Sequence, residues 1–419
     1  MQGLSLLALF MVGAPSLVLA SGYNWGPTLL GLLGLGLWLT RRAQPLPAEA
    51  RTLLAAFLVF GVGQSLLAAW HGQAARHVAG WLHFLSAVPM LVAVLTFRPP
   101  AGLWFMGAAL GGLLSGAWAG WQKWVLGLDR ALGHTYVIQF GDIGLLLGLM
   151  AVLGLLYFHD APRHRGRSLL LLAGAAGGLL TSLLSGSRGG WIGLPLVAWL
   201  LWRTFRPVLA PELRRRVLLL TLLLVSAVVL VPQTGVQSRI GQAYDELHRL
   251  AQGDNSGGSV VPRLYMWRMA LQLTPERPLL GWGQDGFEAE RERQQQAGET
   301  KLRLKTSHVH NEMLDTLVKH GLVGSLLLLL LYAVPIGVFA RGMNAEDHAL
   351  RALAVAGLLV PLLFIDFGLS QTMFGRNSGR VVYFAWIPIL HALYLIRHDQ
   401  VRSLASAMPG YGRQSEVMS

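Results

Sequence analysis

Long apolar blocks separated by short polar loops set the pattern of this chain. A helix needs about 20 apolar residues to cross a bilayer core of roughly 30 Å, and backbone groups in hydrocarbon must find their partners inside the protein. The alternation typical of a membrane barrel is missing, so the pattern predicts about twelve transmembrane helices. The blocks fall at about 3–20, 26–40, 52–70, 78–97, 101–121, 137–158, 168–184, 191–202, 217–232, 322–340, 352–373 and 381–396.

One long hydrophilic segment, from about 233 to 321, interrupts the apolar pattern before the tenth block. Its first part predicts an amphipathic helix, because apolar residues recur there at helical spacing. A linker rich in Gly and Ser follows at 254–261, then a second helix is expected at Arg263–Leu273 and a turn at Gly281–Gly286. The apolar residues of the first of these helices are Ile240, Ala243, Tyr244, Leu247 and Leu250.

The fold class predicted from this pattern is an all-α polytopic membrane protein with a helical segment outside the membrane. Residues 1–232 are expected to hold the first nine transmembrane helices, and 233–321 the polar segment that carries the chemistry. Residues 322–397 are expected to hold the last three helices and 398–419 a tail. No convincing internal repeat is found.

Composition agrees with a membrane protein, since 53% of the residues are hydrophobic and 13% are charged. The chain has no cysteine, which excludes disulfides and thiolate chemistry. A formal net charge of +13 would indicate nucleic acid only if the cations shared one soluble face. They are instead spread over short loops.

The distribution of Lys and Arg predicts the orientation. Seventeen lie in the loops and tail of one side and six in the short loops of the other, while 233–321 is balanced, with eleven cations and eleven carboxylates. Cytoplasmic loops carry the excess, so both termini are expected in the cytoplasm and the long segment outside it. Residues 1–20 lack the cations of a signal peptide and are expected to be the first span, with cleavage left open. The six outer cations are Arg76, Lys123, Arg130, Arg188, Arg376 and Arg380.

Titratable side chains gather in Lys301–Gly324, at the edge of the tenth block. His310 is the candidate general base, because an imidazole titrates near neutral pH and can accept the proton of a sugar hydroxyl. His308, Glu312 and Asp315 are possible orienting partners, among which the residues alone do not decide. Zinc held by His308, His310 and Glu312 in an extended strand is one alternative, and a structural or solvated histidine is another.

Arg188 is the candidate phosphate ligand. It lies in Ser185-Gly-Ser-Arg-Gly-Gly190, where glycines let backbone amides approach an anion and the guanidinium offers a planar fork. The alternatives are an arginine that reaches the membrane interface, or one that pairs with Asp142 or Asp366.

Further cations could contact substrate. Arg263 and Arg268 lie on the second predicted helix, where ordinary solvated charges are the competing interpretation. Lys301, Arg303 and Lys305 alternate with leucines, which is typical of cations that meet lipid headgroups and also of a funnel for a phosphorylated glycolipid.

Three motifs resemble one family. His310-Asn311, nine residues to Gly321 and then Leu-Val-Gly324 look like the signature of bacterial O-antigen ligases. The Arg188 loop, and Arg263-x-x-x-Trp267 followed by Pro278-x-x-Gly-x-Gly283-x-x-x-Phe287, resemble segments of the broader superfamily. That superfamily also contains O-antigen polymerases and some protein-glycosylating enzymes.

The resemblance implies a GT-C-type glycosyltransferase of the bacterial inner membrane that acts in lipopolysaccharide biosynthesis. It would transfer a glycan, with inversion, from undecaprenyl pyrophosphate to lipid A-core at the periplasmic face, without cofactor or metal. Carried over by residue, Arg188 and Arg263 bind the pyrophosphate and His310 is the base. Contacts to substrate are also expected from Arg268, Asn311, His308 and Lys305.

Other functions remain open at this point. An O-antigen polymerase, a protein-glycosylating oligosaccharyltransferase and a lipid or polysaccharide transporter would share much of the pattern. Polar residues distributed along a path through the spans would indicate transport. Here the polar chemistry gathers at one face, which favours an enzyme.

Overall fold

Every regular element of the computed structural model is a helix in the part of the chain that it describes: residues 1–187, 189–212, 215, 241, 244–245, 248, 261–298 and 307–407. Eight helices or helical runs there are long and apolar enough to span a membrane. The prediction of an all-α polytopic membrane protein is therefore confirmed. The eight are α3 (Ala48–Trp70), the run α4, η1 and α5 (Ala75–Phe97), α6 (Gly102–Trp124), α7 (Val137–Tyr157), α8 (Arg165–Ser185), α14 (Glu312–Ala340), α15 (His348–Gly368) and α16 (Asn377–Ala407).

The remaining apolar blocks give shorter helices or lie outside the described residues. Block 3–20 overlaps α1 (Gln2–Met11), 26–40 overlaps α2 (Gly22–Leu39), and 191–202 overlaps α9 (Leu194–Phe205). Three predicted segments fall outside the described part: block 217–232, the amphipathic helix around Tyr244 and the linker at 254–260. Of the amphipathic helix, only single residues such as Tyr244 are described. Twelve spans thus stay a prediction.

Glycines allow α6, α7 and α8 to pack with their backbones in contact. A Cβ at Gly112 would lie 2.4 Å from the carbonyl oxygen of Gly174, and one at Gly178 would lie 2.4 Å from that of Gly144. Lipid gives little hydrophobic drive for helices to associate, so close van der Waals approach at small residues has to stabilise the contact. These three helices form one side of the bundle.

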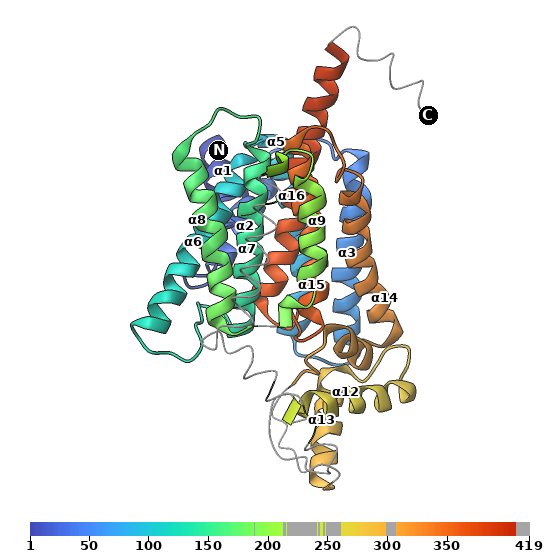
Figure 1. Ribbon diagram of the computed structural model, residues 1–419. Coiled ribbons are helices and arrows are strands. Elements are labelled where there is room, and N and C mark those ends of the chain that lie inside the picture. Colours follow the sequence, from blue (N-terminus) through green and yellow to red (C-terminus); the bar gives the residue numbers. More distant parts are fainter. Residues whose placement is uncertain are drawn as a thin grey trace.

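The polar helices α12 (Val261–Leu273) and α13 (Gly283–Gln296), joined by η4 (Thr274–Glu276), lie at one end of the bundle. The N-terminus and the last turns of α16 lie at the opposite end (Figure 1). The helix predicted at Arg263–Leu273 is confirmed. The turn predicted at Gly281–Gly286 is shorter than expected, because α13 already begins at Gly283.

Helix α14 is interrupted at Gly321, which has φ 63° and ψ −161°. The turn before α13 fits into this break: the carbonyl of Pro278 accepts the N–H of Leu322 at 2.8 Å, and that of Leu279 accepts the N–H of Val323 at 3.1 Å. The turn thereby satisfies amide groups that the broken helix leaves without partners. The segment of α14 before Gly321 is consequently fixed against the α12–α13 layer.

Candidate functional site

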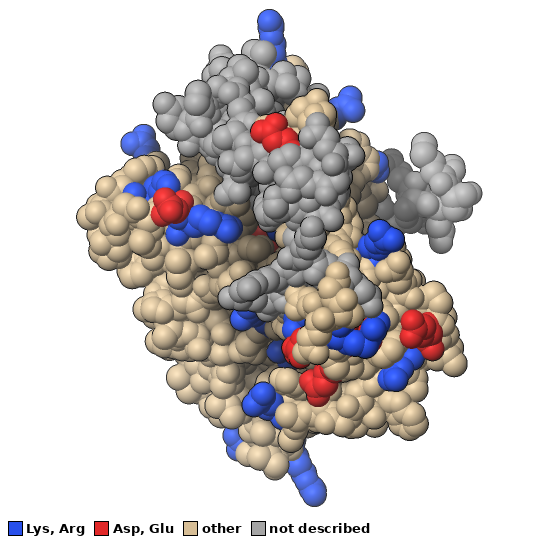
Figure 2. All heavy atoms as spheres, turned by 90° about the horizontal axis from the view of Figure 1, so that it is seen from below, with Lys and Arg blue, Asp and Glu red and all other residues tan. Residues whose placement is uncertain are grey.

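A cavity of about 520 Å³ opens between the transmembrane bundle and the α12–α13 layer. Its wall is largely polar. Figure 2, which looks onto this end, shows basic and acidic side chains close together near the middle of the face. The cations that line it are Arg76, Lys319, Arg376 and Arg380, the carboxylates are Asp285, Glu288, Glu312 and Asp315, and the histidines are His77, His308 and His320.

Val309 anchors the loop that carries the two candidate histidines. Its side chain is fully buried in a small core with Phe287 and Val318. Its N–H donates to Asp315 Oδ1 at 2.9 Å, and its carbonyl accepts from the Trp267 indole at 3.0 Å. With the backbone held on both sides, His308 and His310 have little freedom to move.

Asp315 and Lys319 connect this loop to helix α14. Lys319 Nζ lies 2.7 Å from Asp315 Oδ1 and also donates to the carbonyl of Ser307 at 2.8 Å. The Lys319 side chain is only 5% exposed, so removal of its partner would leave a buried charge uncompensated. Spacing by four residues along a helix explains the pair.

The rings of His308 and His310 pack edge to face, with centroids 4.2 Å apart. His308 lines the cavity, whereas His310 lies behind it, beside Gln371. His310 has φ 57°, in the left-handed region that non-glycine residues seldom adopt. A strained backbone at this residue is typical of a position whose side-chain direction is constrained by function.

Both imidazoles are held neutral. Burial, followed by repulsion from Arg263, lowers the pKa of His310 to about 4, against a smaller opposing effect of Asp315 and Gln371. Burial and the neighbouring His310 lower the pKa of His308 to about 3. Near neutral pH each ring therefore keeps a free nitrogen lone pair that can accept a proton.

Asn311 and Glu312 fix the start of α14. The Asn311 side chain caps the helix by accepting the N–H of Leu314 at 3.1 Å. Glu312 is 5% exposed and accepts the N–H of Phe374 at 3.0 Å, which ties α14 to the loop before α16. Asn311 thus positions its neighbour His310, and Glu312 is turned toward Phe374.

Two arginines at the start of α16 reach the cavity. Arg376 packs over the ring of Tyr136 at 4.8 Å and Arg380 over Trp81 at 5.3 Å. Among the described residues neither has a carboxylate within ion-pair distance, and Arg380 Nε is buried without a hydrogen-bond partner. The aromatic rings hold the two guanidinium groups in place, and the N-terminus of α16 beside them also favours negative charge. Both guanidinium groups are therefore available to bind an anion.

The structure places some predicted site residues together. Arg263, on α12, is close enough to His308 and His310 for its charge to lower both pKa values. Arg268 is exposed on another side of α12. Arg188 and Lys305 lie outside the described residues.

The neighbours of position 188 contact the last turn of α15 and the segment that follows it. A Cβ at Gly189 would meet the Ser370 side chain, and the N–H of Gly193 donates to Asp366 Oδ1 at 2.7 Å. Gln371, which lies beside His310, belongs to the same segment. Gly189 and Gly193 therefore contact a stretch of chain that also holds Gln371, the neighbour of His310.

The zinc alternative finds no support in the geometry. Within the described ranges, His308, His310 and Glu312 do not bring three donor atoms within 4.8 Å of one another. The extended strand that it required is absent there too, because His308 and His310 lie in a loop before α14.

Fold and site together define a class of protein: an all-helical polytopic membrane protein with a cavity at one end of its bundle that is lined by cations and histidines. The family model described as O-antigen ligase matches residues 171–329, from α8 to the middle of α14. This match supports the O-antigen ligase superfamily and confirms the predicted resemblance. The chain is also 26% identical over 375 residues to an uncharacterised protein of Haemophilus influenzae, across 88% of this chain and 93% of that protein.

Sequence reasoning missed the contribution of three outer cations. Arg76, Arg376 and Arg380 are half of the six that deviate from the positive-inside distribution, and all three line the cavity. The positive-inside rule expects few cations in these loops, so their presence there was the sequence signal that could have identified them as site residues.

Proposed function

We propose that this protein is an O-antigen ligase, a GT-C-type glycosyltransferase of the bacterial inner membrane. It transfers a glycan from undecaprenyl pyrophosphate to lipid A-core at the periplasmic face. The observation that carries this proposal is the neutral histidine pair beside the cavity: His308 lines it and His310 packs against His308. Arg376 and Arg380 line the same cavity, and neither has an ion-pair partner among the described residues. The family match adds support for O-antigen ligase or polymerase chemistry.

Arginines take the role that a divalent cation has in many glycosyl transfers. Arg188 and Arg263 were predicted to bind the pyrophosphate, and Arg376 and Arg380 extend this set at the cavity wall. A guanidinium is permanently charged and binds phosphate oxygens through two N–H groups, so it stabilises the charge that develops on the leaving group. The reaction should consequently not depend on added metal.

His310 acts as the general base in one displacement. The acceptor hydroxyl attacks the anomeric carbon, the bond from this carbon to the pyrophosphate oxygen breaks, and the pyrophosphate leaves with the electron pair. His310 takes the hydroxyl proton, and attack opposite the leaving group inverts the anomeric carbon. Negative charge of the bound donor offsets the repulsion from Arg263 and raises the pKa of His310 toward the value that a base needs.

Matched variants test these roles with lipid-linked glycan, lipid A-core acceptor and purified protein. His310→Ala should lower turnover by about 10²-fold or more, the contribution of a general base, while His308→Ala should have a smaller effect. Arg380→Lys should raise the apparent KM for donor, because a point charge does not replace the fork. Lys123→Gln, at the same end of the bundle but outside the cavity, is the control.

Two results would contradict the assignment. Parental turnover in His310→Ala would exclude it as the base. Equal donor KM for Arg380→Lys and Lys123→Gln would exclude a donor site in this cavity. Transfer to a second lipid-linked glycan in place of lipid A-core would indicate the polymerase alternative.

A further inference from the structure

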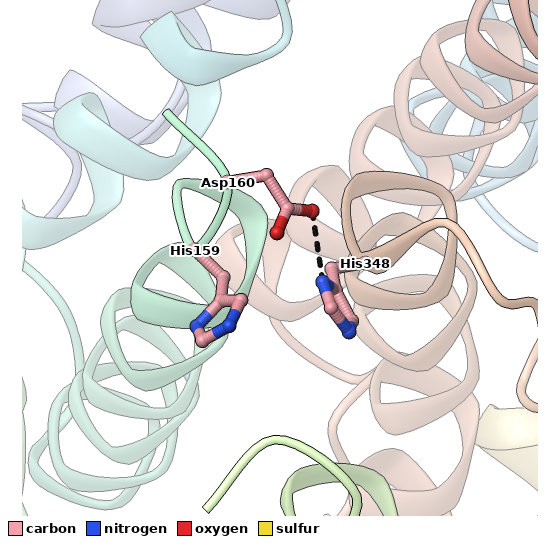
Figure 3. Close-up of side chains that lie close together, drawn as sticks. All are labelled: His159, Asp160 and His348. Atoms are coloured by element: carbon pink, nitrogen blue, oxygen red, sulfur yellow. Dashed lines mark hydrogen bonds and ion pairs between the residues drawn. The ribbon is translucent and has the colours of Figure 1, made fainter. Parts of the chain in front are cut away.

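A second cluster of titratable side chains lies at the end of the bundle opposite the cavity. His159 and Asp160 follow the last turn of α7, and His348 is the first residue of α15 (Figure 3). One donor atom from each side chain lies within 4.8 Å of the other two. Residues almost 190 positions apart in the sequence thus converge from two elements.

The geometry inside this cluster leaves ligand atoms available. His348 Nδ1 lies 2.8 Å from Asp160 Oδ2, and the rings of His159 and His348 meet edge to face with centroids 4.7 Å apart. The side chains of Asp160 and His348 are 67% and 22% exposed. His159 is exposed as well, so the cluster is accessible to solvent, with His348 as its least exposed member.

Asp347, next to His348 in the sequence, is already paired, and the Arg397 that binds it also interacts electrostatically with Asp160. Asp347, adjacent in sequence, has both carboxylate oxygens engaged: Arg397 binds them at 2.9 and 2.5 Å, and Oδ1 also caps α15 through Leu350. Its charge is offset by that of Arg397. Asp160, in contrast, has His348 as its ion-pair partner among the described residues.

Two imidazoles and a carboxylate are ligands that bind Zn²⁺ and related divalent transition metals in proteins. Bonds of about 2.0–2.2 Å place tetrahedral donor atoms roughly 3.5 Å apart, so the donor atoms, which lie within 4.8 Å of one another, would close on an ion by rotation of the side chains. The last carbonyls of α7, which carry partial negative charge, lie next to His159 and favour a cation.

We propose that His159, Asp160 and His348 form a three-ligand site for a zinc-type divalent cation, with water at the fourth position. The bound ion joins the loop after α7 to the start of α15. Because α7 and α15 pack side by side and the cluster lies at the end of the bundle opposite the cavity, the ion stabilises the bundle without taking part in transfer.

Cobalt binding tests the site directly. Full-length protein is purified in detergent through an affinity tag without histidines, stripped with chelator and titrated with CoCl₂. We expect one Co²⁺ per chain, with the intense visible absorption of four-coordinate cobalt, displaced by Zn²⁺. His159→Ala and His348→Ala should each weaken binding by at least about tenfold.

Matched variants separate the site from general surface binding. His398→Ala removes a histidine of α16 outside the cluster and should bind cobalt like the parent, whereas Asp160→Asn, which keeps the side-chain shape, should bind weakly. Addition of Zn²⁺ should raise the melting temperature of the parent and of His398→Ala, but not of Asp160→Asn. Equal cobalt affinity in the parent and the His159→Ala/His348→Ala double variant would overturn the proposal, as would the absence of stoichiometric binding.

Discussion

Single hydrogen bonds at Val309 decide how the candidate base is presented. The backbone of this residue is held by Asp315 and Trp267, and its side chain by the core around Phe287. The histidines on either side are therefore placed by groups that need not touch substrate. Precision of this kind matters, since misplacement by about 1 Å can cost 10²-fold in rate.

The Asp315–Lys319 pair should show this dependence in a double-variant cycle. Asp315→Ala leaves the buried Lys319 charge uncompensated and should lower the free energy of unfolding by about 3–5 kcal/mol. Asp315→Ala combined with Lys319→Met should recover much of that stability. Transfer should stay low in the double variant, because the N–H of Val309 still lacks its acceptor. Denaturation and turnover measured together check the cycle; full activity in the double variant would contradict the positioning role.

The lowered pKa values of His308 and His310 make stability depend on pH. In the folded protein His308 stays neutral down to about pH 3 and His310 down to about pH 4. In the unfolded chain both rings take up protons below about pH 6.5. Stability from this source is present above pH 6.5 and is lost as pH falls toward 4. We expect the melting temperature to fall over that window, and to fall less in His308→Gln/His310→Gln. An identical pH profile for the double variant would refute this cause.

At the scale of elements, the break in α14 joins the membrane bundle to the site. The turn 277–282 lies against it, and the Trp282 N–H donates to the carbonyl of Val318 at 2.9 Å. Gly281 and Gly321 both have positive φ, and a Cβ on either would meet the backbone of the other segment. Two of the motifs that resemble the family are thus two halves of one contact.

Gly321→Ala should damage this contact. A Cβ there would lie 2.3 Å from the carbonyl oxygen of Leu279, and the backbone conformation, with φ 63° and ψ −161°, is essentially restricted to glycine and costs about 1–3 kcal/mol for another residue. Gly337→Ala lies in the same helix, with open space around the new Cβ, and should be neutral or stabilising by up to about 1 kcal/mol. Thermal unfolding of the two variants provides the comparison. Equal melting temperatures would contradict the role of Gly321.

In the whole molecule, apolar residues form the helices of the bundle, and the polar residues of the cavity gather at one of its ends. Apolar periodicity was sufficient to predict the spans that α3 to α8 and α14 to α16 form, because hydrocarbon allows few alternatives to helices. The His310 motif could also be predicted from the sequence, because a group of titratable residues directly beside a transmembrane span is unusual. Neither pattern could show that Arg76 and Arg380 line the same cavity, because their positions are set by the packing of helices far apart in sequence.

Local geometry was harder to predict than the helices. The left-handed conformation of His310 and the start of α13 at Gly283 depend on contacts between the α12–α13 layer and α14. Sequence left three partners open for His310. The structure shows that Asp315 holds the loop, that Glu312 faces Phe374, and that His308 packs on the ring itself.

Reconstituted transfer is the most direct test of the proposed reaction. Purified protein in proteoliposomes receives undecaprenyl-pyrophosphate-linked glycan and lipid A-core, with and without chelator, and the lipid A product is resolved by size. We predict glycan joined to lipid A-core at the same rate in both samples, with inverted anomeric configuration and loss of product in His310→Ala. Absence of joined product, or the same yield from His310→Ala, would contradict the account.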